Sequence, residues 1–235
     1  MSTLVFVRHG QASLFSDDYD QLSETGEQQA QELGRYFARK QVGFEELYVG
    51  PRKRHRDTVA LANRYCGSLP ASKEMREFDE HHVDQLVSDH LRELSRLFPY
   101  LTSLRDNFHN AHTTMDRQRA FARLFESVSI LWVNDACPLF GIESWAEFKQ
   151  RVSTGIDRIL SRSGSRRRVM VATSVGTIVA ALHRALRCPD EVALGLGWRV
   201  WNCSLTAFEF TEDRFTLDRF NIMSHLDDPK LWTYR

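Results

Sequence analysis

Apolar residues along this chain follow two different spacings. Short runs of β-branched and other large apolar residues are typical of buried strands, and they occupy residues 4–7, 45–49 and 169–173. Longer stretches with apolar residues three and four positions apart predict helices, and they cover residues 26–40, 54–65, 144–160 and 177–186. Two alternating runs, 205–210 and 215–220, predict a closing pair of strands across a turn at Glu212-Asp213. The sequence therefore predicts an α/β fold.

The stretch from residue 83 to about residue 134 has no strand pattern. Its apolar residues recur at helical spacing from Val83 to Phe98 and again from Ala120 to Leu131. This predicts two helices, separated by a looser stretch over residues 105–116 that is rich in histidine and asparagine. We expect one domain over residues 1–235, in which an insert of about residues 83–135 forms a helical cap beside the sheet.

Composition narrows the choice of partner and compartment. Lys and Arg together number 31, as do Asp and Glu, so no global charge attracts nucleic acid or a membrane surface. Four scattered cysteines without a C-x-x-C pair favour reduced thiols and a cytoplasmic location. The first apolar run is expected to be a strand, not a signal peptide, and no apolar run approaches a membrane span.

The first predicted strand ends in Arg8-His9-Gly10. The carboxyl ends of strands in α/β sheets are where ligands bind, and glycine lets the backbone turn and approach a ligand closely. An arginine presents a planar fork of donors to phosphate oxygens, and a neutral imidazole is able to accept a phosphoryl group. The tripeptide alone is also compatible with an ordinary turn after a strand.

Further motifs follow in a fixed order. They are Asp20 to Ala30 with its Leu-Ser-x-x-Gly-x-x-Gln-Ala pattern, Tyr48 to Val59 with Arg54 four residues before Thr58, Arg76-Glu77-Phe78-Asp79, Gly141-Ile142-Glu143-Ser144 with Arg151 in the following helix, and Val169 to Thr177. Together with Arg8-His9-Gly10, this ordered set resembles the histidine phosphatase superfamily, the phosphoglycerate mutase-like proteins. The resemblance implies a three-layer αβα sandwich with a helical cap.

The resemblance also implies roles for individual residues. His9 is the expected nucleophile, which forms a phosphohistidine, while Arg8 and Arg54 bind the phosphoryl oxygens. Glu77 is the expected general acid, although an exposed loop charge is the plain alternative. Without the family motif, Arg54 would be read as one of several solvated charges in the basic run 52–56. That run lacks interleaved aromatic residues, which disfavours nucleic-acid binding.

Ser174 departs from the family pattern, because it aligns with the family's second catalytic histidine. As a structural residue, it is a good N-cap for the helix that follows. As a functional residue, its hydroxyl is able to give one hydrogen bond to a bound phosphate, but it carries no charge. Losing a donor at a transition state costs on the order of 10²–10³ in rate. Ser174 therefore implies a slower phosphatase or another group that compensates, and His225 is one candidate.

Gln11 and His81 are additional candidates for the site. His81 is followed by His82, which invites a metal interpretation. Adjacent residues on a strand face opposite sides, and the sequence offers no third ligand, so no metal site is expected. We expect instead that one of the two histidines reaches the pocket and supplements the acid.

These observations favour a metal-independent and cofactor-independent phosphohydrolase that acts on a phosphorylated small molecule or a phosphoprotein. The alternative is a weak or inactive member of the family that binds phosphate or a phosphoprotein. A phosphoglycerate mutase is disfavoured, because residues 11–16 lack the Glu and Asn that follow the family's Arg-His-Gly in mutases. The sequence favours no particular oligomeric state.

Overall fold

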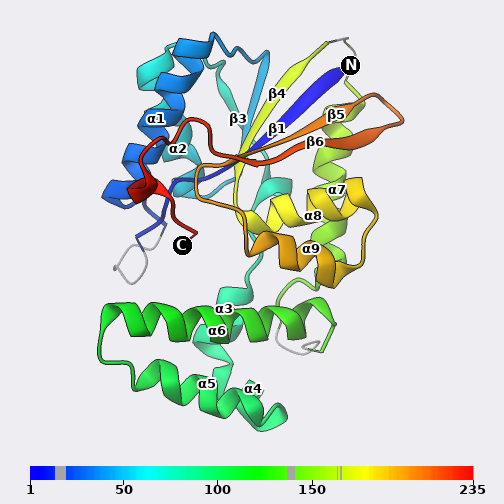
Figure 1. The fold of residues 1–235 in the computed structure, drawn as a ribbon. Coiled ribbons are helices and arrows are strands. Elements are labelled where there is room, and N and C mark those ends of the chain that lie inside the picture. The colour runs from blue at the N-terminus through cyan, green and yellow to red at the C-terminus, as the bar shows by residue number, and fades with distance from the viewer. Residues whose placement is uncertain (14–19, 137–140, 163, 165, 235) are drawn as a thin grey trace. The chain divides into compact units, whose positions relative to one another are not determined.

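A computed structural model describes residues 1–13, 20–136, 141–162, 164 and 166–234 (Figure 1). The chain divides into two compact units. The first contains Met1–Glu80 and Lys149–Arg235, and the second contains His81–Phe148. The first unit is built on a sheet, and the second is helical.

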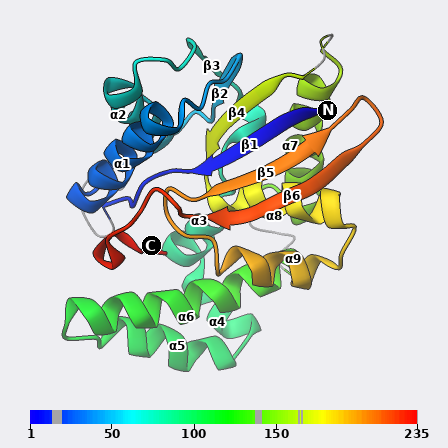
Figure 2. The same ribbon diagram turned by 45° about the horizontal axis from the view of Figure 1, so that its top comes forward.

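The sheet unit contains six strands in the order β3-β2-β4-β1-β5-β6 among the described residues (Figure 2). Their bounds are β1 Ser2–Arg8, β2 Glu46–Val49, β3 Ser72–Glu74, β4 Arg168–Thr173, β5 Leu205–Phe210 and β6 Phe215–Ile222. Strands β1 to β4 are parallel, while β5 runs antiparallel to both β1 and β6. The register pairs Arg8 with Thr173 and Val49 with Ala172, so three parallel strands end at one edge of the sheet.

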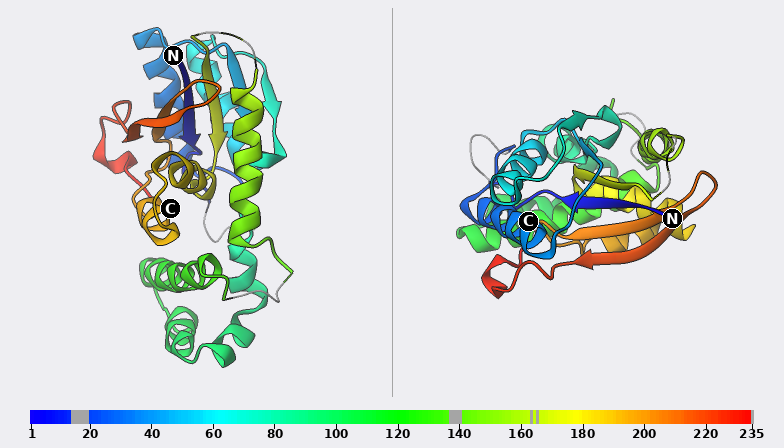
Figure 3. Two further views of the ribbon diagram at one scale, coloured as in Figure 1. Left: turned by 90° about the vertical axis from the view of Figure 1, so that its right-hand side faces the viewer. Right: turned by 90° about the horizontal axis from the view of Figure 1, so that it is seen from above.

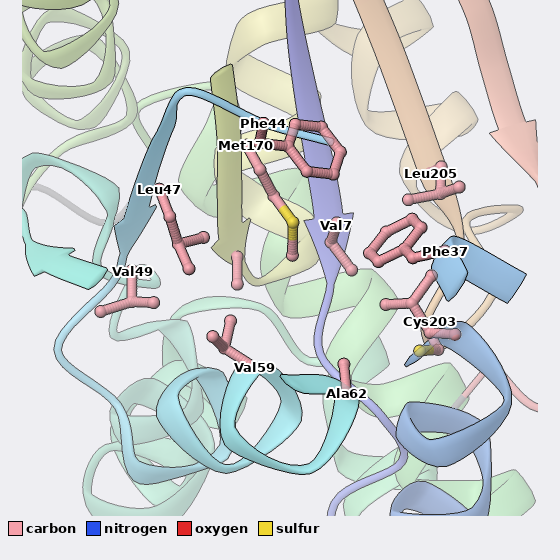
Figure 4. Packing of buried hydrophobic residues seen from close by; sticks show 12 residues of the cluster. Val7, Phe37, Phe44, Leu47, Val49, Val59, Ala62, Met170, Cys203 and Leu205 are labelled. Carbon is pink, nitrogen blue, oxygen red and sulfur yellow. The ribbon is translucent and has the colours of Figure 1, made fainter. Parts of the chain in front are cut away.

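Helices α1 (Glu24–Lys40) and α2 (Lys53–Cys66) pack on one face of this sheet (Figure 4). Val7 contributes to that core from β1, because successive residues of a strand point to opposite faces. The apolar residues that meet there include Leu33, Phe37, Val59, Ala62, Met170 and Ala172. Burial of these side chains fixes the first turn of α2 beside the carboxyl ends of β1 and β4.

Helices α7 (Trp145–Leu160) and α8 (Val175–Leu186) lie on the opposite face, and α7 is on the far side of the sheet from α1 in Figure 3. Phe6 points to this face and meets the rings of Phe78 and Phe208 edge-on, with centroids 5.8 Å away in both cases. Gly155 of α7 lets the helix approach Phe78, since a Cβ at this position would lie 2.9 Å from the ring. The predicted three-layer αβα arrangement is confirmed.

The helical unit differs from the prediction of two helices. It contains α3 (Val83–Asp89), α4 (Leu91–Leu97), α5 (Tyr100–His109) and α6 (Thr114–Val133). A break at His90 divides the first predicted helix into α3 and α4. Residues expected to form a loose stretch belong instead to α5 and α6. Proline at the start of α5 has no N–H to continue the preceding helix. Trp132 packs against Trp145 and Phe148 with ring centroids 5.3 and 5.8 Å apart, which makes the aromatic residues of this unit a core.

Among the described residues, the elements that the pattern did not predict include the short strand β3 and the helix α9 (Asp190–Gly197). Strand β3 is exposed throughout, so it carries no hydrophobic signal. Among the described residues, no helix has both the length and the apolar content needed to cross a bilayer.

Candidate active site

His9 follows β1 directly and is held between two neighbouring segments. Its N–H donates to the Thr173 carbonyl at 2.9 Å, and its carbonyl accepts from the Cys203 N–H at 3.1 Å. The side chain is buried, with 6% of the residue exposed. These contacts anchor His9 at the sheet edge where β1 and β4 end.

The imidazole of His9 has a defined orientation. Nδ1 lies 2.6 Å from the Gly10 carbonyl, and Arg54 Nε donates to Nε2 at 3.2 Å. A carbonyl only accepts and a guanidinium only donates, so the proton belongs on Nδ1 and the lone pair on Nε2. Burial lowers the pKa of His9 well below its usual value, and the charges of Arg54 and Arg8 lower it further. His9 is therefore neutral near pH 7, with a lone pair on Nε2.

Gly10 and Gly26 allow the loop after β1 to cross the start of α1 closely. A Cβ at Gly10 would collide with the Gly26 carbonyl, and a Cβ at Gly26 would collide with the Gln11 backbone. The Gly10 N–H donates to Thr58 Oγ1 at 3.1 Å. The two glycines and Thr58 fix the backbone that carries the His9 ring.

Arg54 connects three parts of the site from the first turn of α2. In addition to the contact with His9, its Nη1 donates to Asp20 Oδ1 at 2.9 Å and its Nη2 to Ser174 Oγ at 3.4 Å. Asp20 Oδ2 also accepts from the Lys53 N–H at 2.7 Å. The structure thus brings together His9, Arg54 and Ser174, three of the residues that the sequence motifs singled out.

Ser174 occupies the N-cap position of α8, but its hydroxyl makes no capping hydrogen bond. The capping interpretation of this side chain is therefore wrong. The hydroxyl lies 2.7 Å from His55 Nε2, and both residues are fully buried. The ring of His55 also lies near that of His9, with centroids 5.7 Å apart.

Arg8 reaches the carbonyl groups of two later segments. Its guanidinium donates to the Val200 carbonyl and, at 2.6 Å, to the Tyr234 carbonyl. Its positive charge still acts on His9, whose pKa it lowers. Arg8 therefore contributes charge to the site while it ties the C-terminal segment to the sheet.

Glu77 and Glu80 lie in different surroundings. Glu77 pairs with Arg158 of α7, and 16% of its side chain is exposed. Glu80 is buried, and its Oε2 accepts from the Gly176 N–H at 3.3 Å, two residues after Ser174. Arg151 of α7 holds the connecting segment by donating to the Glu77 and Asp79 carbonyls at 3.1 and 3.2 Å.

The remaining candidates lie in other surroundings. Gln11 bonds the start of α1, where its Oε1 accepts from Ser23 Oγ at 2.9 Å. His81 belongs to the helical unit, where its ring lies 5.0 Å from that of Trp132. His225 packs beside Tyr36 at 5.9 Å between ring centroids. Of the segment that disfavours a mutase, residues 14–16 lie outside the described residues.

His55, Glu80 and Asp20 are site residues to which the sequence analysis gave no role. His55 lies within the basic run 52–56, which in the sequence suggested a solvated helix face. In the structure only its neighbours Lys53 and Arg56 are exposed, while His55 is buried. Asp20 is the first residue of the motif Asp20 to Ala30, and Glu80 follows Glu77 by three residues. Within the described residues, no group of three or more histidine, cysteine or acidic side chains is arranged to hold a metal ion.

Comparisons with known proteins show the family of the chain. The model of the histidine phosphatase superfamily (branch 1) matches residues 4–124 and 103–223. The chain is 24% identical over 236 residues to a Bacillus subtilis (strain 168) protein described as uncharacterized phosphatase PhoE, and the match covers 96% of this chain and 97% of the relative.

Solved structures share the fold at lower identity. YhfR of Bacillus stearothermophilus has a TM-score of 0.66 at 16% identity, with coverage of 97% of this chain and 100% of that chain. Phosphoserine phosphatase of Entamoeba histolytica, in complex with 3-phosphoglyceric acid, has a TM-score of 0.63 at 18% identity, with coverage of 96% and 100%. A mycobacterial glucosyl-3-phosphoglycerate phosphatase has a TM-score of 0.61 at 19% identity, with coverage of 95% and 100%. Since the family model spans most of the sequence, the chain belongs to the histidine phosphatase superfamily (branch 1).

Proposed function

We propose that the protein hydrolyses a phosphomonoester through a phosphohistidine formed on His9. The observation that carries this proposal is the state of the His9 ring, with Nδ1 held by the Gly10 carbonyl and Nε2 beside Arg54. A nucleophile must present a free lone pair and a fixed direction of attack. Burial supports this by keeping the pKa of His9 low, so that the ring stays neutral.

The reaction proceeds in two steps. His9 Nε2 attacks phosphorus, an N–P bond forms, and the bond to the ester oxygen breaks as a carboxylic acid protonates that oxygen. The resulting carboxylate then takes a proton from water while the water oxygen attacks phosphorus. The N–P bond breaks, its electron pair returns to Nε2, and inorganic phosphate leaves with His9 neutral again.

Arg54 and Ser174 bind the phosphoryl oxygens in this proposal. Arg54 transfers its hydrogen bond from His9 Nε2 to a phosphoryl oxygen as substrate arrives, and its contact with Asp20 keeps the guanidinium aimed. Fixed donors of this kind stabilise the charge of a phosphoryl group in transfer. Arg8 adds positive charge to the site while its donors remain on the Val200 and Tyr234 carbonyls.

Glu77 is the acid that the family pattern predicts, and the contacts favour Glu80 for the same role. Glu77 forms an ion pair with Arg158 of α7, so its carboxylate is already engaged there. Glu80 is buried and touches the Gly176 N–H near Ser174, which is itself in contact with Arg54. We therefore propose Glu80 as the acid and base, with Glu77 as the alternative that paired variants distinguish.

The proposed substrate is a phosphorylated small molecule. Two proteins of the same fold are named as phosphatases of such compounds, glucosyl-3-phosphoglycerate and phosphoserine. The scheme uses neither a metal ion nor a cofactor, and we propose that the enzyme works without them. Mutase activity stays disfavoured, because Gln11-Ala12-Ser13 begins the segment that departs from the mutase pattern.

The test is hydrolysis of p-nitrophenyl phosphate from pH 4 to 8 in the presence of a chelator, by wild type and His9→Ala. We expect turnover in the wild type alone, and an acid-labile, alkali-stable phosphoenzyme when the reaction is quenched early. Phosphate or vanadate binding without turnover above the His9→Ala background would contradict hydrolysis and support the phosphate-binding alternative.

A further inference from the structure

His55 is a buried histidine to which the hydrolysis scheme gives no role. It lies in the first turn of α2, directly after Arg54, and it is 0% exposed. A histidine in a core of this kind loses its hydration, so its ring nitrogens need polar partners. The partner that Nε2 finds is the Ser174 hydroxyl, at 2.7 Å.

The His55 imidazole lies against Gly50, directly after β2. A Cβ at Gly50 would collide with His55 Nδ1, so glycine at this position leaves the space that the imidazole fills. The Gly50 N–H is already used by the Ala172 carbonyl, at 3.0 Å. The adjacent Gly50 backbone raises the pKa of His55, against the lowering caused by burial. Among the described residues, His55 Nδ1 makes no hydrogen bond.

Ser174 stands where the family pattern has a catalytic histidine, and His55 touches it from the neighbouring helix. The Ser174 hydroxyl is shared by His55 Nε2 and, at 3.4 Å, by Arg54 Nη2. Imidazole and hydroxyl thus form one connected unit that adjoins the arginine proposed to bind the phosphoryl group. An imidazole therefore lies beside position 174, but it comes from α2.

We propose that His55 is the positioning residue for phosphate at this site, and that the His55–Ser174 pair replaces the histidine absent from position 174. His55 Nε2 donates to Ser174 Oγ, and the Ser174 hydroxyl donates to a phosphoryl oxygen beside Arg54 Nη2. This inference rests on the proposed function, since it assigns the donor that the phosphoryl group meets.

Protonation of His55 would give the His55–Ser174 pair a positive charge. When Nε2–H donates to Ser174 and Nδ1 also carries a proton, His55 is an imidazolium. In the empty site, burial and the charges of Arg54, Arg52 and Arg56 keep the pKa of His55 well below 6.5. His9 faces it as well and is neutral. A phosphate dianion offsets these charges, so binding draws one proton from solvent onto His55.

The test measures binding of orthophosphate by calorimetry, because binding does not depend on turnover. We compare wild type with His55→Gln, Ser174→Ala and the double variant between pH 5.5 and 8. We expect each single variant to weaken binding at least tenfold. The double variant should bind like either single one, because each substitution breaks the same chain of hydrogen bonds from His55 through Ser174 to phosphate. His183→Gln is the matched control, since it removes a partly buried histidine of α8 that pairs with Asp190 and should leave phosphate affinity unchanged.

Two further readouts separate a positioning role from support of the fold. In wild type labelled with ¹⁵N-histidine, saturating phosphate should shift the His55 Nε2 resonance, assigned from its absence in His55→Gln. The exchange variant His55→Ala/Ser174→His should recover part of the affinity lost in His55→Ala.

Wild-type affinity in His55→Gln, additive losses in the double variant, or an unmoved His55 resonance would each overturn the inference. A wild type that fails to bind phosphate overturns it as well. Phosphate binding with the expected coupling but without hydrolysis of p-nitrophenyl phosphate would overturn the proposed function alone.

Discussion

Arg54 Nε lies 3.2 Å from His9 Nε2, so the first turn of α2 donates a hydrogen bond to the residue that ends β1. This single contact joins the two motifs that the sequence places 45 positions apart. It also defines which nitrogen of His9 carries the lone pair, because a guanidinium offers no acceptor. The chemistry proposed for the site follows from this relationship.

Arg54→Lys should remove the bridge between His9, Asp20 and Ser174 while it keeps the positive charge. A lysine offers no fork of donors in fixed geometry, so we expect kcat/KM for p-nitrophenyl phosphate to fall on the order of 10²–10³-fold. Arg56→Lys is the control, because Arg56 is exposed and contacts Glu74 at the surface. Equal losses in both variants would refute a specific role for Arg54.

Glu80→Gln and Glu77→Gln should separate the two candidate acids. We expect the Glu80 variant to lose on the order of 10²–10⁴-fold in kcat, as is typical when a general acid is removed. The Glu77 variant should lose far less, because its carboxylate is occupied by Arg158. A leaving group of low pKa, such as p-nitrophenol, needs little protonation, so the loss of a general acid shows most clearly on a phenyl or alkyl phosphate. Both variants are therefore assayed on p-nitrophenyl phosphate and on a phenyl or alkyl phosphate. The reverse ranking on the alkyl ester would restore Glu77 as the acid.

Buried histidines make the free energy of unfolding depend on pH. Burial lowers the pKa of His225 to about 4, from 6.5. Below pH 6.5 His225 binds a proton in the unfolded chain but not in the folded chain. Its contribution to the free energy of unfolding is therefore fully present above pH 6.5 and is lost as the pH falls toward 4. His9 and His55 have lowered pKa values too, and they act in the same direction.

His225→Gln removes one of these titrations. Between pH 6.5 and 5, the free energy of unfolding measured in urea should fall by about 2 kcal/mol less in the variant than in the wild type. The variant should also keep its turnover of p-nitrophenyl phosphate, since the ring packs beside Tyr36. An unchanged pH slope would contradict the lowered pKa, and a large loss of turnover would support His225 as a compensating residue.

Gln29→Ala should loosen the attachment of the C-terminal segment to α1. The fully buried Gln29 side chain donates to the Leu231 carbonyl at 2.7 Å and to Thr233 Oγ1 at 2.9 Å, and it accepts from the Gln11 N–H. Removing it leaves buried polar groups unpaired, so we expect a loss of about 2–4 kcal/mol in the free energy of unfolding. Gln28→Ala, on the exposed side of the same helix, should change stability by less than about 0.5 kcal/mol.

The amino-acid sequence determined most of the sheet and the residues at its edge. Apolar runs of strand length and helices of regular spacing give β1, β2, β4, α1, α2 and α8 within a few residues. These elements are local in origin, because their patterns match the periods of two and 3.6 residues. Arg8, His9, Arg54 and Ser174 then follow from the ordered motifs.

The basic run at the start of α2 shows what the pattern left open. Successive residues of a helix point about 100° apart, so the packing of α2 decides which of them turn inward. Arg54 and His55 are buried, while Lys53 and Arg56 are exposed. All four are polar, so no hydrophobic contrast marks the inner face in the sequence.

Only the tertiary structure decided the partners of these polar residues. His55 meets Ser174 across 119 positions of sequence, and Glu80 meets Gly176 across 96. Apolar burial fixes how α2 and α8 lie against the sheet, and the polar contacts form where that packing brings their ends together. The sequence by itself therefore predicted most strands and helices of the sheet unit and made His9 the candidate nucleophile. The fold decided which histidine stands beside Ser174, because side chains that meet over such separations leave no local pattern.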